Sequence, residues 1–148
     1  MNLGRTALHQ ADQNGHVGVV RYLLRAAAHP NVVSTDGKGS SPLTLACHNG
    51  QLAVVQALIE AGANVNHSRP YDGFTSLRLA AQEGHIEVVR ALLAANADPR
   101  IAAHNGGTAL FVAKAMNHTA IAALLEARLA ELAAPAPAAG SGSGSGSA

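Results

Sequence analysis

The chain has few of the residues that mark several classes of protein. Its 148 residues include one cysteine, no tryptophan and only 3% aromatic residues. A single cysteine cannot form an internal disulfide, and scarce aromatic rings argue against the stacking surfaces that bind single-stranded nucleic acids. Basic and acidic side chains are almost equal in number, ten and nine. No electrostatic signature therefore favours nucleic acid or an anionic membrane as a partner.

Long apolar runs are also missing. No segment approaches the roughly eighteen consecutive apolar residues that a membrane-spanning helix requires, and the start MNLGRTALHQ lacks the apolar stretch of a signal peptide. With one cysteine, these absences predict a soluble protein of the reducing cytoplasm. A length of 148 residues with 48% apolar content suits one compact domain or a short repeat array.

Four segments of the chain align with one another without gaps. They begin at Thr6, Ser41, Thr75 and Thr108, with periods of 35, 34 and 33 residues. Each starts with Thr or Ser and carries Leu two places on, Ala five places on and Gly or Asn nine places on. Apolar residues follow thirteen and seventeen places on. This register in four copies predicts a repeat protein.

The residue types at these positions predict two helices in each copy. The first hydroxyl can accept a hydrogen bond from an amide of the first helical turn, and the Leu and Ala lie three apart on one face. The Gly or Asn suits a left-handed turn that ends the first helix, and the later apolar residues form a stripe on a second helix. Helices of about eight to eleven residues are marginal alone, so each copy depends on its neighbours.

The second copy resembles the ankyrin repeats. Its sequence DGKGSSPLTLACHNGQLAVVQALIEAGANVN, from Asp36 to Asn66, follows their pattern D/xxGxTPLHxAAxxGHxxVVxxLLxxGADxN almost throughout, and the similarity covers about residues 3 to 128. The resemblance implies an all-α fold, an ankyrin-repeat solenoid of four helix-turn-helix units with short projecting hairpin loops. The His of the pattern is present as His9 but becomes Thr44, Arg78 and Phe111 in later copies. In those copies the hydrogen bonds that this His forms between units are in doubt.

The domain prediction follows the repeats. We expect an ankyrin-repeat domain over residues 1–134 and a flexible tail over residues 135–148, where Pro and Ala are followed by alternating Gly and Ser. Glu126 replaces an apolar residue in the last copy, which is typical of a terminal repeat that meets solvent. The expected repeats are about residues 3–35, 36–69, 70–102 and 103–133.

The resemblance implies that the protein binds another protein on a concave face made by the hairpin tips and the first helices. Tyr71 and Phe74 are the strongest candidates, because two of only four aromatic residues fall at one predicted tip and aromatic anchors dominate interfaces. The alternative is that one or both rings pack locally on the adjacent helices. The candidate partner-binding residues are Lys38, Ser40, His48, Asn49, Tyr71, Asp72, Phe74, Gln82, Glu83, His104, Asn105 and Met116.

Catalytic, metal-binding and cofactor-binding residues are not predicted. Eight histidines are present, but no HExxH, CxxC or tight His/Cys/Asp cluster accompanies them. Cys47 stands where the pattern has a small buried Ala, and His48 cannot act as its base because adjacent helical side chains point about 100° apart.

The preferred hypothesis is a non-enzymatic scaffold or inhibitor that binds a folded partner as a monomer. One alternative is a targeting or regulatory segment of a larger enzyme or effector. Another is a structural spacer that binds nothing.

Overall fold

The computed structural model describes residues 6–26 and 28–134. The predicted tail, residues 135–148, lies outside the described residues, so the division of the chain at residue 134 stays a prediction. The described residues form eight helices: α1 (Ala7–Gln13), α2 (Val17–Arg25), α3 (Pro42–His48), α4 (Leu52–Glu60), α5 (Ser76–Glu83), α6 (Ile86–Ala94), α7 (Ala109–Ala115) and α8 (Thr119–Ala133).

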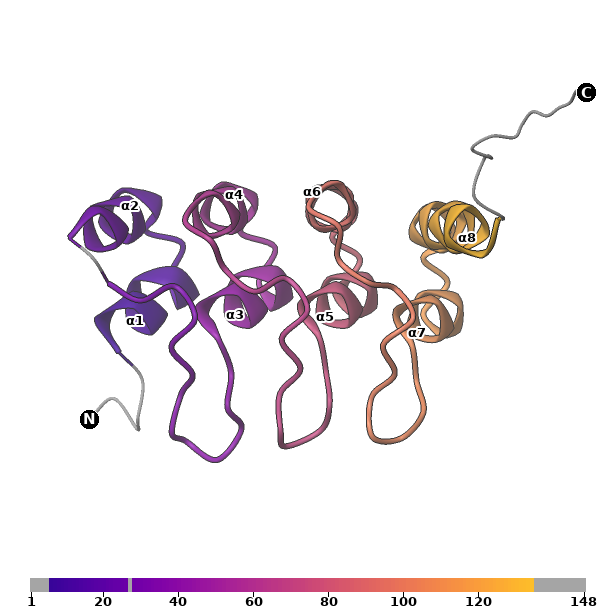
Figure 1. The fold of residues 1–148 in the computed structure, drawn as a ribbon, viewed down its shortest axis with the longest axis horizontal. Helices are drawn as coiled ribbons and strands as arrows, with labels where there is room; N and C mark the ends of the chain where they lie inside the picture. The colour runs from indigo at the N-terminus through magenta and orange to yellow at the C-terminus, as the bar shows by residue number, and fades with distance from the viewer. Residues whose placement is uncertain (1–5, 27, 135–148) are drawn as a thin grey trace, which may run out of the picture.

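The helices lie in two rows, as Figure 1 shows. The first helices of the units, α1, α3, α5 and α7, form an inner row, and α2, α4, α6 and α8 form an outer row above it. Three long hairpins project from the inner side, one between each pair of successive units. Within the described residues, one isolated antiparallel bridge, Ser68 with Thr75, pairs the two arms of the second hairpin. The predicted all-α solenoid of four helix-turn-helix units is confirmed.

The predicted signals that start and end the first helices are confirmed. Hydroxyl oxygens of Ser41, Thr75 and Thr108 each accept a hydrogen bond from an amide three residues on, at 3.2 Å, which satisfies a donor that the helix itself leaves unpaired. The first helices are slightly shorter than expected, at seven or eight residues. They end before left-handed residues with these φ angles: Gly15 72°, Gly50 69°, Gly84 79° and Asn117 61°.

The core runs along the stack between the two rows. Leu43, Leu58, Leu77, Leu92 and Leu125 are all at most 1% exposed, and neighbouring units contribute to one continuous cluster. The burial of Leu58, Leu92 and Leu125 confirms the apolar stripe predicted on the second helices. Cys47 is also fully buried in this cluster, as predicted for a residue at a small apolar position.

Hydrogen bonds between successive units are formed at the glycine turns. The Nε2 atom of His85 donates to the His48 carbonyl oxygen at 3.1 Å, and His118 donates in the same way to the Gln82 carbonyl oxygen at 3.1 Å. A β-carbon at Gly50 would lie 2.7 Å from the His85 ring. Glycine is needed there both for its positive φ and for the close approach of the next unit.

Candidate functional site

A concave surface that several predicted site residues line lies between the first two hairpins and helices α3 and α5. It has a volume of about 410 Å³, and we call it the hairpin groove. Because units two and three stack side by side, residues about 35 positions apart in the sequence face each other across it. The hairpin groove is lined by Lys38, Ser40, Thr44, Leu45, His48, Asn49, Arg69, Phe74, Leu79 and Gln82.

Side-chain hydrogen bonds fix the tip of the first hairpin. Asp36 Oδ1 accepts from Ser34 Oγ at 2.7 Å and from the Lys38 amide at 3.1 Å, and the Ser34 amide donates to the Ser40 carbonyl oxygen at 2.8 Å. This turn leaves the Lys38 side chain exposed. Asp36 therefore fixes the backbone conformation of this turn, and that conformation places Lys38 at the rim of the hairpin groove.

Ser40 differs from the expectation that it lies at an exposed tip. It is only 1% exposed, because its backbone closes the hairpin. Its amide donates to Ser34 Oγ at 3.0 Å, and its carbonyl oxygen accepts from His9 Nε2 at 3.0 Å. Ser40 therefore lines the bottom of the hairpin groove and links the first two units.

An ion pair organises the second hairpin. Arg69 Nε donates to Asp72 Oδ1 at 3.1 Å, a second bond joins Arg69 Nη2 to Asp72 Oδ2, and the Phe74 amide also donates to Asp72, at 3.0 Å. Partial burial acts to raise the pKa of Asp72, but the hydrogen bonds from Arg69 and Phe74 and the charges of Arg69 and Arg78 hold that pKa below its usual value. Asp72 is thus a stabilising residue of the hairpin and does not line the hairpin groove.

Phe74 is half-buried, whereas we expected both aromatic rings of this hairpin to be exposed. The Arg78 guanidinium carbon lies 3.6 Å from the centre of its ring, and that of Arg69 lies 5.2 Å away. Arg78 is 6% exposed, and its Nη1 donates to Gln82 Oε1 at 2.8 Å. Burial lowers the pKa of the Arg78 guanidinium, and the charge of Asp72 opposes that shift. Of the two hypotheses for this ring, an exposed anchor or local packing on a helix, the structure shows local packing for Phe74, with a cation–π contact to Arg78.

The buried Arg78 explains one departure from the repeat pattern. In the first unit, His9 at this position joins Thr6 to the carbonyl oxygen of Ser40 in the next unit. In the second unit, Thr44 donates to the Ser41 carbonyl oxygen of its own helix at 2.7 Å. The hydrogen bond between units that His9 forms is therefore not repeated by Thr44, which bonds within its own helix. In the third unit, Arg78 at this position stacks on Phe74.

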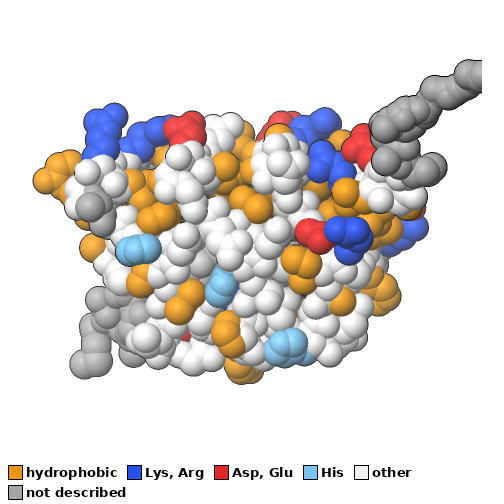
Figure 2. Space-filling view, viewed as in Figure 1, with side chains coloured by type: hydrophobic (Ala, Val, Ile, Leu, Met, Phe, Trp, Pro, Cys, Tyr) orange, Lys and Arg blue, Asp and Glu red, His pale blue; other side chains and the backbone are white. Residues whose placement is uncertain are grey.

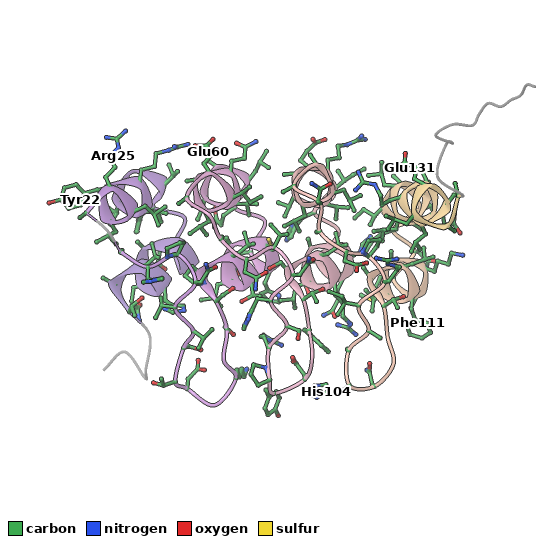
Figure 3. All side chains as sticks on the ribbon, in the orientation of Figure 1. Tyr22, Arg25, Glu60, His104, Phe111 and Glu131 are labelled. Carbon is green, nitrogen blue, oxygen red and sulfur yellow. The ribbon has the colours of Figure 1, made fainter. Side chains whose placement is uncertain are left out.

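The predicted site residues fall into two groups. Six of them line the hairpin groove, namely Lys38, Ser40, His48, Asn49, Phe74 and Gln82. The other six lie outside it, namely Tyr71, Asp72, Glu83, His104, Asn105 and Met116. Tyr71 is exposed at the second hairpin, and His104 lies at the hairpin tips in Figure 3, with its amide donating to the Asp72 carbonyl oxygen at 2.9 Å. Asn105 accepts from the Gly107 amide at 2.9 Å, which shapes the third hairpin.

Sequence reasoning missed two features of this surface. Arg69 lines the hairpin groove beside Phe74, and Phe111 projects below α7 as an exposed ring, close in the chain to the exposed Met116. Phe111 stands at the His position of the repeat pattern in the fourth unit, on a first helix. That position could have identified it as a candidate binding residue. Arg69 carried no comparable signal, because its position depends on how the second hairpin folds.

The lining of the hairpin groove suits hydrogen bonding to a polar partner surface. Lys38 and Arg69 carry positive charge, His48, Asn49 and Gln82 offer further donors, and no Asp or Glu among the described residues lines it. Within residues 6–26 and 28–134, no three His, Cys, Asp or Glu side chains are grouped so that they could hold a metal ion. The arrangement fits recognition of a polar surface.

The outer row presents a different surface. In the view of Figure 2, Lys, Arg, Asp and Glu side chains gather over the outer helices, while the hairpin half of this face is mostly uncharged. None of the helices in the described part of the chain is long and apolar enough to cross a membrane.

Comparison with known proteins gives consistent results. The model for ankyrin repeats in three copies matches residues 29–103 and 61–132, and the single-repeat model matches residues 3–35. BCL-6 corepressor-like protein 1 of Mus musculus is 36% identical over 116 residues, which cover 78% of this chain and 6% of that protein. Neurogenic locus notch homolog protein 1 of Danio rerio is 34% identical over 122 residues, 82% of this chain and 5% of that protein. Alpha-latrotoxin-Lh1a of Latrodectus hasselti is 44% identical over 61 residues, 40% of this chain and 4% of that protein.

The chain thus spans only 4 to 6% of the length of these relatives. Ankyrin repeats generally act as protein–protein interaction modules and not as catalysts. Stacked helix pairs, capped first helices, glycine turns and projecting hairpins agree with the matched models over most of the sequence, and the chain belongs to the ankyrin repeat family.

Proposed function

We propose that this chain is a non-enzymatic scaffold or inhibitor that binds a folded protein partner on its concave face, with the hairpin groove at the centre of contact. The observation that carries the proposal is the convergence of six predicted partner-binding residues in one concave surface of about 410 Å³. Aromatic residues and Met are enriched in protein interfaces, where a few side chains contribute most of the binding energy. Tyr71 and Met116 are exposed outside the groove and would be such side chains.

The charges of the hairpin groove support a partner surface that is rich in acceptors. Lys38 is exposed at the rim, and Arg69 stands beside Phe74 deeper in the lining. A partner carboxylate or backbone carbonyl could accept hydrogen bonds from these groups without displacing the ion pair of Arg69 with Asp72. Binding should then weaken as the salt concentration rises.

The direct test substitutes exposed groove residues and leaves the fold intact. The variant Lys38→Glu with His48→Glu should lower partner binding at least about tenfold, because it places two negative charges in the groove. Its control is Arg25→Glu, a charge reversal on the outer row, which Figure 3 shows well away from the hairpins. Partners captured from lysate by the parent chain would be identified by mass spectrometry, and each binding constant would then be measured with purified proteins. Equal loss of binding in both variants would contradict the proposal.

The two aromatic residues of the second hairpin need separate substitutions. Tyr71→Ala removes an exposed ring at the hairpin. It should weaken partner binding and leave the free energy of unfolding unchanged. Phe74→Ala removes the ring that stacks on buried Arg78, so it should lower the free energy of unfolding as well as the affinity. Thermal unfolding of both variants separates the two effects.

A second candidate function is that of a targeting or regulatory segment of a larger protein. The observation in its favour is that the relatives match this chain over only 4 to 6% of their own length. Sequencing the full transcript from the source organism would test it. If a catalytic domain is encoded in the same frame, its activity should change when the groove variant is introduced into the whole protein.

A further inference from the structure

The second hairpin carries more positive charge than its own carboxylate can balance. Arg69 lines the hairpin groove, and its Nε and Nη2 atoms both bond to Asp72. This pair uses both oxygens of Asp72, which is the one carboxylate between residues 61 and 75. The Nη1 atom of Arg69 makes no hydrogen bond with a described residue, so its two N–H donors remain for another acceptor.

Arg78 adds a second guanidinium beside this pair. It is 6% exposed, and it stacks at 3.6 Å on the ring of Phe74, a residue of the groove lining. Its Nη1 donates to Gln82, but its buried Nε has no hydrogen-bond partner among the described residues. A nearly buried charge without a carboxylate of its own is costly. The charges of both guanidiniums act on the single carboxylate of Asp72, so the cluster keeps one positive charge that no residue offsets directly.

A third cation comes from the first hairpin, across the hairpin groove. Lys38 is exposed in the lining, and its ammonium group forms no ion pair within residues 6–26 and 28–134. Asp36, two residues earlier, accepts from Ser34 Oγ and from the Lys38 amide, so hydrogen bonds hold it in its own turn. The described lining contains no Asp or Glu. Both hairpins therefore bring positive charge to the groove, and neither brings negative charge into its lining.

We infer that the hairpin groove receives an acidic segment of the protein partner, with a Glu or Asp carboxylate held between the Arg69 guanidinium and the Lys38 ammonium. A carboxylate brings two acceptor oxygens and a full negative charge, whereas a backbone carbonyl brings one oxygen and no charge. The carboxylate alone offsets the excess charge of Arg69 and Arg78. This inference rests on the proposed function, because it names the chemistry of the partner at the same groove.

The size of the hairpin groove suits a short stretch of chain. Its volume is about 410 Å³, within the range of about 300 to 1,000 Å³ that is typical of small-ligand sites. Charge complementarity of this kind speeds association and excludes partners of the same sign. A segment with several neighbouring Glu or Asp residues is therefore the expected occupant, and a basic segment is excluded.

The probe is a capped tetraglutamate peptide, compared with capped tetraglutamine, which has nearly the same shape and no charge. Each peptide is titrated into the isotope-labelled full chain, and shifts of the amide NMR signals report where and how tightly it binds. Tetraglutamate should shift the amides of groove residues such as Lys38, Phe74 and Gln82, with a dissociation constant on the order of 1 mM at low salt. Tetraglutamine should bind at least about tenfold more weakly, and added salt should weaken only the tetraglutamate complex.

Substitutions then assign the binding to the groove. Lys38→Gln removes one exposed cation and should weaken tetraglutamate binding about threefold. Its matched control is Arg25→Gln, which removes the same charge on the outer row, away from the hairpins in Figure 3, and should bind like the parent. The double variant Arg69→Gln with Asp72→Asn keeps the net charge of the chain, yet should lose most of the binding because the free guanidinium edge is gone. The amide spectrum of each variant verifies the fold, and Lys38→Gln alone decides if the double variant does not fold.

Two outcomes would overturn the inference. One is that the two peptides bind equally or that neither binds. The other is equal weakening by Lys38→Gln and Arg25→Gln, which would indicate attraction by the overall charge. Either outcome would leave the proposed function in place, because a captured protein could still lose affinity when the groove is substituted. Failure of the proposed function would look different, since tetraglutamate would bind in the groove while the captured proteins would be insensitive to the groove variant.

Discussion

The two ends of the helical stack present different side chains, although they derive from the same repeat. At the first unit, Val19 and Tyr22 are exposed, and Leu23 on the same helix lines an apolar pocket. At the last unit, Glu126 pairs with Lys114, and Arg128 Nη1 donates to the Leu93 carbonyl oxygen of the preceding unit at 3.0 Å. The C-terminal end therefore has a polar cap, whereas the N-terminal end keeps the chemistry of an internal interface. The polar character of the last unit therefore comes from particular substitutions, of which Glu126 is one.

The largest expected difference between the ends concerns two leucines in the same register. Leu125→Ala should lower the free energy of unfolding by about 2 to 5 kcal/mol, because Leu125 is fully buried and its loss leaves a cavity. Leu23→Ala should cost clearly less, because Leu23 is already half-exposed beside a pocket. Urea unfolding of both variants measures both losses. Equal losses would remove the distinction between the ends.

A smaller effect should come from the hydrogen bond that ties α8 to the third unit. Arg128→Ala removes the donor to the Leu93 carbonyl oxygen and an ion pair with Glu131. We expect a loss of about 1 kcal/mol, since the side chain is partly exposed and the bond competes with water. Hydrogen exchange should show earlier opening of α8 and unchanged protection of α2 and α4. A loss of protection spread evenly over the stack would show that α8 is not a separately held cap.

Asp72 offers a pH test in the middle of the stack, away from both ends. Its pKa in the folded protein is held below the value of about 3.9 in an unfolded chain. The ionised carboxylate therefore stabilises the fold above that value, and this contribution is lost as the pH falls through the folded-state pKa. The stability difference between the parent and Asp72→Asn should be largest at neutral pH and shrink in acid. A difference that grows in acid would contradict the assigned direction.

The smallest expected change in stability is at Glu126, where substitution should alter association instead. Glu126→Leu restores the apolar residue that the other units carry, and loses an exposed ion pair that contributes about 0 to 1 kcal/mol. The free energy of unfolding should change little. An apolar residue at this position, together with the exposed Val19 and Tyr22 of the first unit, would allow head-to-tail contacts between copies, so light scattering should report larger species than for the parent. Unchanged association would show that Glu126 does not prevent contacts of the last unit with other copies.

Much of the fold could be predicted because its signals are local. Ser41 and Thr75 cap helices through amides three residues away, and Gly50 and Gly84 end helices through their own φ angles. Two candidate residues, His48 at the end of α3 and Asn49 directly after it, are exposed as predicted, because the period of a helix decides which side chains face the core. Where these side chains meet a partner stays a prediction.

The positions of Ser40 and Phe74 could not be predicted in the same way. Ser40 is buried where its backbone closes the hairpin, and His9, thirty-one residues earlier, donates to its carbonyl oxygen. Phe74 turns inward because Arg78 follows one helical turn later and stacks on its ring. Both outcomes depend on particular side chains at positions where the repeat pattern tolerates several residue types.

The sequence by itself determined the number of units, the helix starts and ends and the side chains that form the core, because these follow from periodicity and from the conformational preferences of single residues. Only the tertiary structure decided which concave surface forms and which end of the stack stays open. Val19 and Val54 carry the same side chain in the same register, yet one is half-exposed and the other buried. The difference lies in whether a neighbouring unit covers them.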